Sequence, residues 1–190
     1  LSRNFEERTK VQKMDYTFID GNPAIVRSAD GGDLTAAVFA SSGEPPELEI
    51  RVFTSGDVIF KTSAGMPSPV MPLQGLWTYD GHWAMEILYA APEIWIGQVF
   101  IDGNMVNQEK GYDEAFGFQS LSGKPFYFFQ RDGEIGISYD GKEANLGYGS
   151  IPHYRCCSES VLNPTPAENM VAFFAQRGDD WYYVELGVFQ

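Results

Sequence analysis

The chain has 190 residues, and its 13 Lys and Arg against 26 Asp and Glu give a formal net charge of −13. The basic residues are scattered singly, which argues against nucleic acid, because binding a polyphosphate requires clustered cations that displace counterions. The acidity also disfavours an anionic membrane surface, and no apolar run reaches the roughly 18 residues that span a bilayer. Cations, basic proteins and neutral ligands such as sugars remain compatible with this charge.

Residues 1–13, LSRNFEERTKVQK, predict a polar N-terminal arm that is either a short helix or an extended segment. The arm contains neither an initiator Met nor an apolar signal core. We therefore expect a processed protein that is exported or targeted to an organelle.

Residues 14–190 predict a single all-β domain. The chain is rich in strand formers, with 14 Phe, 10 Tyr and 4 Trp, and in turn formers, with 20 Gly and 11 Pro. Short β-branched and aromatic runs alternate with Asp-Gly pairs, which accept the positive φ angles of tight hairpin turns. These pairs lie at residues 20–21, 30–31, 80–81, 102–103, 132–133 and 140–141.

Strand–turn–strand stretches recur along the chain. TFIDGN (17–22) and VFIDGN (99–104) share Phe-Ile-Asp-Gly-Asn, and aligning the hairpins places turns near residues 20, 63, 102, 140 and 186. A period of about 40 residues built only of strands is typical of β-propeller blades. We therefore predict an antiparallel, propeller-like array of about five short β-repeats. A single closed β-barrel or a sandwich is the alternative.

The stretch GLWTYDGHWAMEI (75–87) is the richest in aromatic and polar groups. Strand alternation puts Trp77 and Tyr79 on one face and Trp83 on the same face as Met85 and Ile87. An indole ring beside a carboxylate and an imidazole suits a sugar or a cation, although these aromatics could equally be core. Arg131 and Arg177 lie at equivalent places in two hairpins. They are expected either to face a shared channel or to pair with neighbouring acidic residues. The predicted ligand-binding residues are Trp77, Tyr79, His82, Trp83, Glu86, Arg131 and Arg177.

Oxygen ligands concentrate in the stretch DGNMVNQEKGYDE (102–114). Calcium takes several oxygen ligands that often come from one loop, so Asp102, Asn104 and Asn107 are the predicted calcium ligands. A solvated turn is the alternative, because the stretch lacks the central Gly and terminal Glu of an EF-hand. We expect no other cofactor.

The chain has two cysteines, Cys156 and Cys157, which are adjacent and follow His153. They predict either a redox-active vicinal disulfide or two buried, inert thiols. With His153 they supply at most three metal ligands, which disfavours a structural zinc site.

Together these features favour a non-catalytic binding or scaffolding module that recognises a glycan or a partner protein through aromatic and acidic loop residues. One alternative is a carbohydrate-active hydrolase with acids at the channel mouth, which predicts a buried carboxyl with a raised pKa in a cleft. The other is a β-barrel carrier of a small apolar ligand, which predicts a closed barrel around one internal cavity.

Overall fold

The computed structural model describes residues 25–29, 33–154, 160 and 163–187. Strands dominate this part of the chain, and its one helix is the short α1, Val106–Lys110, so the predicted all-β class is confirmed. No helix in the described ranges is long and apolar enough to cross a membrane. The predicted N-terminal arm, residues 1–13, lies outside the described residues.

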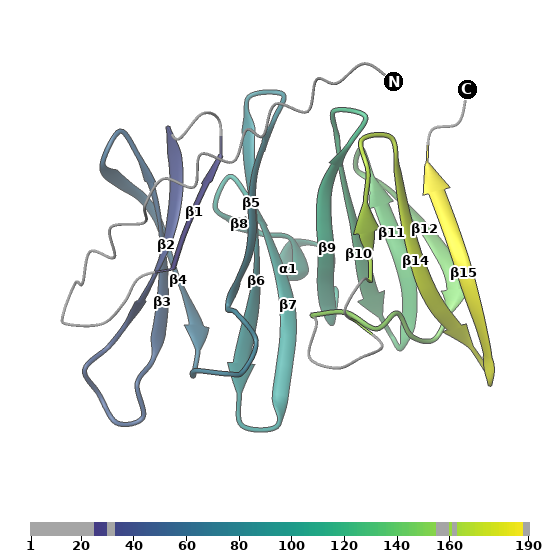
Figure 1. Ribbon diagram of the computed structural model, residues 1–190, viewed down its shortest axis with the longest axis horizontal. Helices are drawn as coiled ribbons and strands as arrows, with labels where there is room; N and C mark the ends of the chain where they lie inside the picture. The colour runs from purple at the N-terminus through teal and green to yellow at the C-terminus, as the bar shows by residue number, and fades with distance from the viewer. Residues whose placement is uncertain (1–24, 30–32, 155–159, 161–162, 188–190) are drawn as a thin grey trace, which may run out of the picture.

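The strands follow one another in four antiparallel units, numbered here in chain order (Figure 1). The first unit contains β1 (Ile25–Ala29), β2 (Leu34–Ala40), β3 (Leu48–Thr54) and β4 (Asp57–Gly65). The second contains β5 (Leu73–Tyr79), β6 (His82–Ala91), β7 (Ile94–Ile101) and β8 (Asn104–Met105). The third contains β9 (Glu114–Leu121), β10 (Lys124–Arg131), β11 (Glu134–Tyr139) and β12 (Lys142–Tyr148). The fourth contains β13 (Thr165–Pro166), β14 (Met170–Arg177) and β15 (Asp180–Gly187).

The Asp-Gly turns form as predicted wherever the structure describes them. Asp80, Asp102, Asp132 and Asp140 all have φ near +50° and are followed by a glycine of positive φ, the geometry of a tight hairpin turn. The pairs at 20–21 and 30–31 lie outside the described residues. The turns expected near residues 63 and 186 are wrong, because these residues lie inside β4 and β15. Both positions were predicted from a regular spacing of the turns, but the units differ in strand and loop length.

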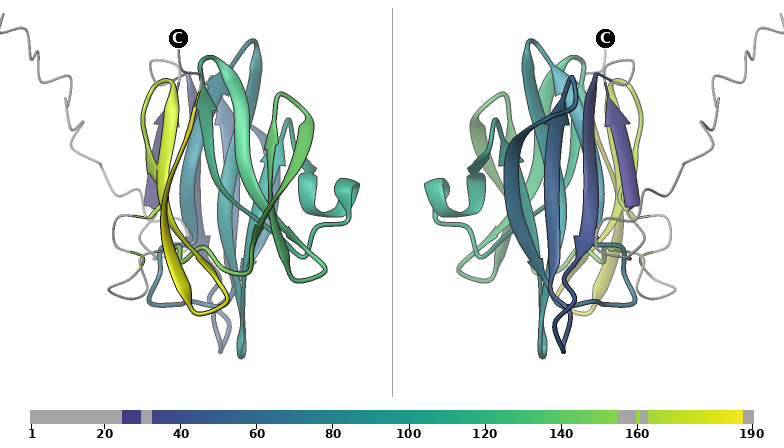
Figure 2. Two further views of the ribbon diagram at one scale, coloured as in Figure 1. Left: turned by 90° about the vertical axis from the view of Figure 1, so that its right-hand side faces the viewer. Right: turned by 90° about the vertical axis from the view of Figure 1, so that its left-hand side faces the viewer.

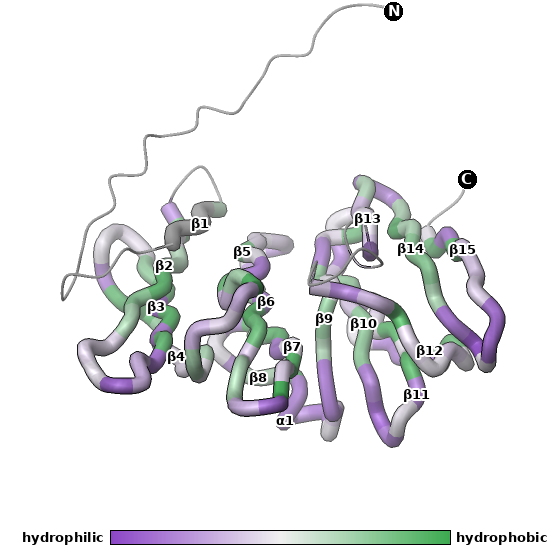
Figure 3. The backbone as a smooth tube through the Cα atoms, turned by 60° about the horizontal axis from the view of Figure 1, so that its bottom comes forward, coloured by the Kyte–Doolittle hydropathy of each residue, from purple (hydrophilic) through white to green (hydrophobic). Residues whose placement is uncertain are grey.

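The units stack face to face along the long axis of the molecule, from β1–β4 at one end to β13–β15 at the other (Figure 1). A middle unit therefore buries both of its faces. On β10, Phe126 and Phe128 pack toward the fourth unit, whereas Tyr127 and Phe129 pack toward the second. Hydrophobic segments accordingly follow the strands and hydrophilic ones gather at turns such as β10–β11 (Figure 3).

At two boundaries, neighbouring units are joined by a backbone hydrogen bond at the same place. In each case the amide just after the last strand of one unit donates to a carbonyl near the end of the second strand of the next. The two bonds are Met66 N to Ala90 O (2.8 Å) and Gly149 N to Gln176 O (2.9 Å). At the first boundary, one parallel bridge between Gly65 and Ala90 also merges the first two units into an eight-stranded sheet.

None of the sheets in the described part of the chain closes on itself. This arrangement does not fit the closed-barrel alternative, because a barrel has no free edge strands. The helix α1 stands out from one side of the stack (Figure 2).

Candidate functional site

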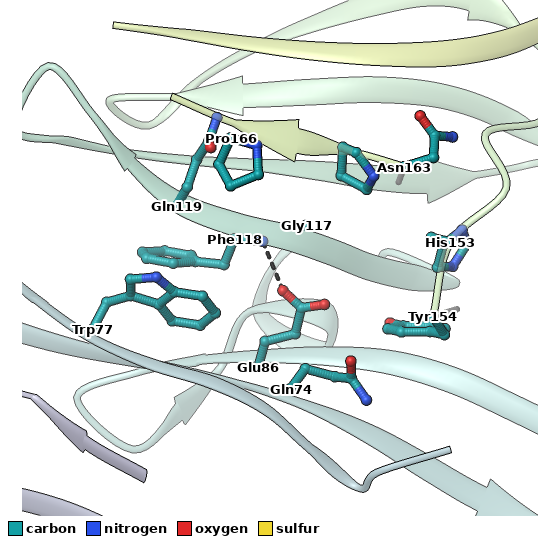
Figure 4. A pocket seen from close by; sticks show the side chains of 11 residues that line it. Gln74, Trp77, Glu86, Gly117, Phe118, Gln119, His153, Tyr154, Asn163 and Pro166 are labelled. Atoms are coloured by element: carbon teal, nitrogen blue, oxygen red, sulfur yellow. Dashed lines mark hydrogen bonds between the residues drawn. The ribbon is translucent and has the colours of Figure 1, made fainter. Parts of the chain in front are cut away.

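One pocket lies where the first strands of three units approach one another. We call it the Glu86 pocket, and it has a volume of about 210 Å³. The second, third and fourth units contribute through β5, β6, β9 and β13, and the segment after β12 completes the wall. Its principal lining residues are Trp77, Glu86, Gln119, His153, Tyr154 and Pro166 (Figure 4).

A bulge in β9 shapes the floor of the pocket. Gln119 lies opposite Phe126 and Phe116 lies opposite Phe128, so Gly117 and Phe118 together face a single residue of β10. Gly117 has φ +66°, and a Cβ there would lie 2.9 Å from the Phe128 ring, so the position requires glycine. A bulge of this kind turns backbone N–H groups away from the strand ladder and toward the neighbouring unit.

The carboxyl of Glu86 accepts hydrogen bonds from these free N–H groups. Glu86 is 5% exposed, and its Oε2 accepts from the N–H of Phe118 at 2.7 Å, with Gly117 as a second backbone donor. Burial is the largest influence and raises the pKa of Glu86 to about 7. The two backbone donors and the charge of His153 lower this pKa, while the charge of Glu114 raises it. Near neutral pH the carboxyl is therefore able to hold or release a proton.

His153 lies at the end of the pocket beside Glu114. Its ring stacks on Phe116 with a centroid distance of 3.7 Å and an interplanar angle of 8°. The Nδ1 atom contacts the carbonyl of Ile151 at 2.6 Å, and Nε2 lies 3.3 Å from the Glu114 carboxylate. Both ring nitrogens therefore face oxygen acceptors, the Ile151 carbonyl and the Glu114 carboxylate.

Tyr154 completes this end of the pocket in a conformation that few bulky residues adopt, with φ +68°. Its hydroxyl is buried and has no hydrogen-bond partner among the described residues. Burial is the largest cause that raises its pKa, followed by the charges of Glu86 and Glu114. The hydroxyl lies against Gly97 of β7, where a Cβ would approach to 1.5 Å.

The amide of Gln119 is the most unusual group of the site. It is 6% exposed, and neither its Oε1 nor its Nε2 has a hydrogen-bond partner in the described part of the chain. The nearby amide of Asn163 is equally buried, but it donates to Pro152 O and Phe174 O and accepts from Phe174 N. An unpaired buried amide costs about 1–3 kcal/mol, so an exception of this kind requires an explanation.

A second depression, the His82 cleft, lies near the turns of the second and third units and measures about 400 Å³. Its lining includes Tyr79, His82, Asp102, Asn104, Lys124 and Tyr127. His82 Nδ1 lies 2.6 Å from Asp102 Oδ2, and Asp102 Oδ1 accepts from Trp83 N at 3.0 Å. Partial burial is the largest single influence and raises the pKa of Asp102, but these two hydrogen bonds and the His82 charge together lower it. Burial, Asp102 and Tyr127 raise the pKa of Tyr79 to about 12.

The predicted ligand-binding residues therefore separate into different places. Trp77 and Glu86 line the Glu86 pocket, whereas Tyr79 and His82 line the His82 cleft. Trp83 packs in the core between the first and second units, on the same face as Met85 and Ile87, as strand alternation predicted.

The two arginines face neither site. Arg131 lies over the ring of Tyr112 and pairs with Glu143 at 3.1 Å, in agreement with the simpler of its two interpretations. Arg177 lies over Tyr148 and donates to the carbonyls of Leu146 and Gly147 rather than to a carboxylate.

The three predicted calcium ligands are also dispersed. Asp102 and Asn104 line the His82 cleft, but Asn107 is buried, with Nδ2 donating to Gly97 O and Oδ1 accepting from Val99 N. No group of three or more His, Cys, Asp or Glu side chains suited to a metal ion occurs in the ranges that the structure describes. Cys156 and Cys157, the predicted redox pair, lie outside those ranges.

Gln119 and Tyr154 were not predicted as site residues from the sequence, and His153 was weighed only as a zinc ligand. One signal was available, namely the glycine inside the apolar strand EAFGFQSL (114–121), because an isolated strand glycine often marks a bulge. The convergence of Gln119 with Glu86 depends on how two units stack, which no local pattern encodes.

Comparisons of the chain with models of protein families, with curated proteins and with solved structures found no significant match.

Proposed function

We propose that the chain is a non-catalytic binding module that takes the end of a neutral glycan into the Glu86 pocket. The observation that carries this proposal is the set of buried polar groups without partners in one pocket, Gln119 and the Tyr154 hydroxyl. Unpaired polar groups that line a pocket are suited to a ligand that supplies the missing hydrogen bonds.

The other residues that line the pocket also suit a sugar as the ligand. Trp77 presents an indole whose ring lies over Gly75, where a Cβ would approach ring atoms to 2.0 Å, and it contacts Phe118 with a centroid distance of 5.0 Å. An orientated indole offers an apolar face to the C–H groups of a sugar ring, while Glu86 can donate or accept a hydrogen bond near neutral pH. Both properties suit a neutral, polyhydroxylated ligand.

We further propose that the four units are blades of a propeller-like array. The hydrogen bond that recurs at two unit boundaries supports this interpretation, because it joins corresponding positions of successive units. In such an array the first strand of each unit lines the central channel, and β5, β9 and β13 all contribute to the Glu86 pocket. The glycan site would then lie on the channel side.

A hydrolase is the second candidate, and the raised pKa of Glu86 is the observation that favours it. Glycoside hydrolysis ordinarily requires two carboxyl groups that flank the scissile bond. Among the described residues, Glu86 is the only carboxyl that lines this pocket. We therefore prefer binding to catalysis.

A partner protein is the other ligand class compatible with a binding module. The outer face of the fourth unit supports it, since Phe174, Trp181 and Tyr183 are 49%, 52% and 60% exposed there. Exposed aromatic clusters are common at protein interfaces.

The glycan proposal is tested by titrating the protein with neutral monosaccharides and following chemical shifts by NMR. We expect saturable binding with Kd in the millimolar range, as is reasonable for a single small ring. Trp77→Ala should weaken binding at least about tenfold, which corresponds to one lost aromatic contact. Trp95→Ala is the matched control, because Trp95 is exposed on β7 and does not line the pocket. Absence of binding by any sugar, or equal loss in both variants, would contradict the proposal.

A further inference from the structure

The amide of Gln119 also indicates which sugar the pocket selects, an inference that rests on the proposed glycan function. Both polar atoms of this amide are free of partners in the described chain, so a bound group must supply an acceptor for Nε2 and a donor for Oε1. Hydroxyl groups can supply both, so the choice between ligands depends on the wall around Gln119.

The Gln119 amide shares its pocket with apolar side chains. Phe118 precedes Gln119 on β9, and Pro164 and Pro166, at the start of the fourth unit, line the same pocket. The wall is close here, because a Cβ at Gly117 would lie 3.1 Å from Pro164 Cγ. Figure 4 shows Gln119, Trp77 and Pro166 toward one end and His153 and Tyr154 toward the other, with Glu86 between them. A ligand group that fits the Gln119 end therefore combines a carbonyl with a small apolar surface.

We propose that the pocket selects a sugar that carries an N-acetyl group. The acetamido carbonyl accepts from Gln119 Nε2, the hydroxyl on the adjacent ring carbon donates to Gln119 Oε1, and the methyl group packs against Pro164 and Pro166. The sugar ring lies beside Trp77, and the remaining hydroxyl groups of the sugar point toward Glu86 and Tyr154.

The size of the pocket limits the ligand. Its volume of about 210 Å³ is below the usual range for drug-sized ligands, roughly 300–1,000 Å³. One substituted ring fits this space better than a chain of rings, so the site recognises a terminal sugar rather than the middle of a polysaccharide.

The experiment compares N-acetylglucosamine with glucose by NMR titration of the whole chain. The two sugars differ only in the acetamido group, and we expect the N-acetylated sugar to bind at least about tenfold more tightly, the usual discrimination from one well-placed apolar group and its hydrogen bond. Gln119→Leu should reduce this ratio to near one. The control, Gln108→Leu on the exposed part of α1, should leave it unchanged.

The outcomes separate the two proposals. If glucose and N-acetylglucosamine bind equally, the selection by Gln119 is wrong while the glycan-binding function stands. If neither sugar binds, the function itself fails and the selection fails with it. The comparison in the unsubstituted protein is decisive even if Gln119→Leu does not fold, and Gln119→Met provides a second variant of similar shape. A preference that survives in a folded Gln119 variant would also overturn the inference.

Discussion

The Glu86 pocket and the His82 cleft both include residues of the second and third units, yet the pKa of a carboxyl group shifts in opposite directions in the two places. Glu86 is buried, and burial outweighs its hydrogen bonds, so its pKa rises. Asp102 has a partly exposed side chain, and its bonds to Trp83 N and His82 outweigh its burial, so its pKa falls. The cleft is a set of groups that satisfy one another, whereas the pocket holds groups whose partners are incomplete. This difference, rather than size, is the reason we propose the pocket as the binding site.

The largest expected effect comes from the glycine that shapes the pocket. Gly117→Ala should destabilise the protein by about 3 kcal/mol, because a left-handed φ costs roughly 1–2 kcal/mol and overpacking adds a similar amount. Gly81→Ala in the turn beside the cleft is the matched control, since Gly81 also has positive φ but has nothing within 4 Å of an added Cβ. Gly81→Ala should lower the free energy of unfolding only by the cost of the left-handed backbone conformation, about 1–2 kcal/mol.

Urea unfolding followed by tryptophan fluorescence measures both variants. Equal losses would mean that the bulge relaxes around the new methyl group, and the argument that Gly117 is required by close packing would then be wrong.

Glu86 should make the protein less stable as pH rises. Its pKa is about 7 in the folded protein against an ordinary value of 4.5, so the folded state binds more protons between these values. The stability contributed by this group is therefore fully present below pH 4.5 and is lost as pH rises toward and past 7, by about 3 kcal/mol. Comparing the urea midpoints of the protein and of Glu86→Gln across this pH range isolates the effect.

Asp102 serves as a control, because its contribution to stability should change with pH in the opposite direction. Because its folded pKa is lowered from 3.8, its contribution is present above that value and is lost as pH falls through the folded pKa. Asp102→Asn should therefore be less stable than the unsubstituted protein near neutral pH, and this difference should shrink in acid. A pH profile of Glu86→Gln parallel to that of the unsubstituted protein between pH 4.5 and 8 would disprove the assigned burial of Glu86.

Two buried amides give the next comparison. Gln119→Leu should stabilise the protein by about 1 kcal/mol, because it removes a polar group that is buried without partners. Asn163→Leu should destabilise it by roughly 2 kcal/mol, because it leaves the N–H of Phe174 and two carbonyls unpaired. Thermal unfolding distinguishes the two directions. A destabilised Gln119→Leu would show that the amide already has partners in solution and would weaken the binding proposal.

The sequence predicted the strand content and the Asp-Gly turns well, because both depend on local chemistry. It also predicted correctly that Trp77 and Tyr79 share one face and that Trp83 shares a face with Met85 and Ile87, since side chains alternate along a strand. It could not predict that Trp77 and Tyr79 would line different depressions. That outcome depends on where the β9 bulge and the turns of the third unit meet β5, which is decided by stacking between units.

The same limit applies to Glu86. A single acid within the apolar run WAMEILYA (83–90) is visible in the sequence, but its hydrogen-bond donors come from a bulge about thirty residues later in the chain, Phe118 being 32 residues away. Spacing along the chain carries no information on such a contact. The raised pKa of Glu86 could therefore be assigned only once the second and third units were placed side by side.

The smallest effect is expected at the His82–Asp102 pair. The two side chains are 55% and 40% exposed, so solvent screens their attraction, and pairs of this kind contribute about 0.2–1 kcal/mol. His82→Ala should therefore lower the unfolding free energy by less than about 1 kcal/mol at low salt, and the loss should shrink further in about 1 M NaCl, where screening extends to within a few ångströms. Sugar titrations of His82→Ala should match those of the unsubstituted protein, because His82 does not line the Glu86 pocket. If this variant instead lost sugar binding while remaining folded, the sugar would bind in the cleft and not in the pocket. Unpaired buried polar groups would then not mark the binding site in this fold.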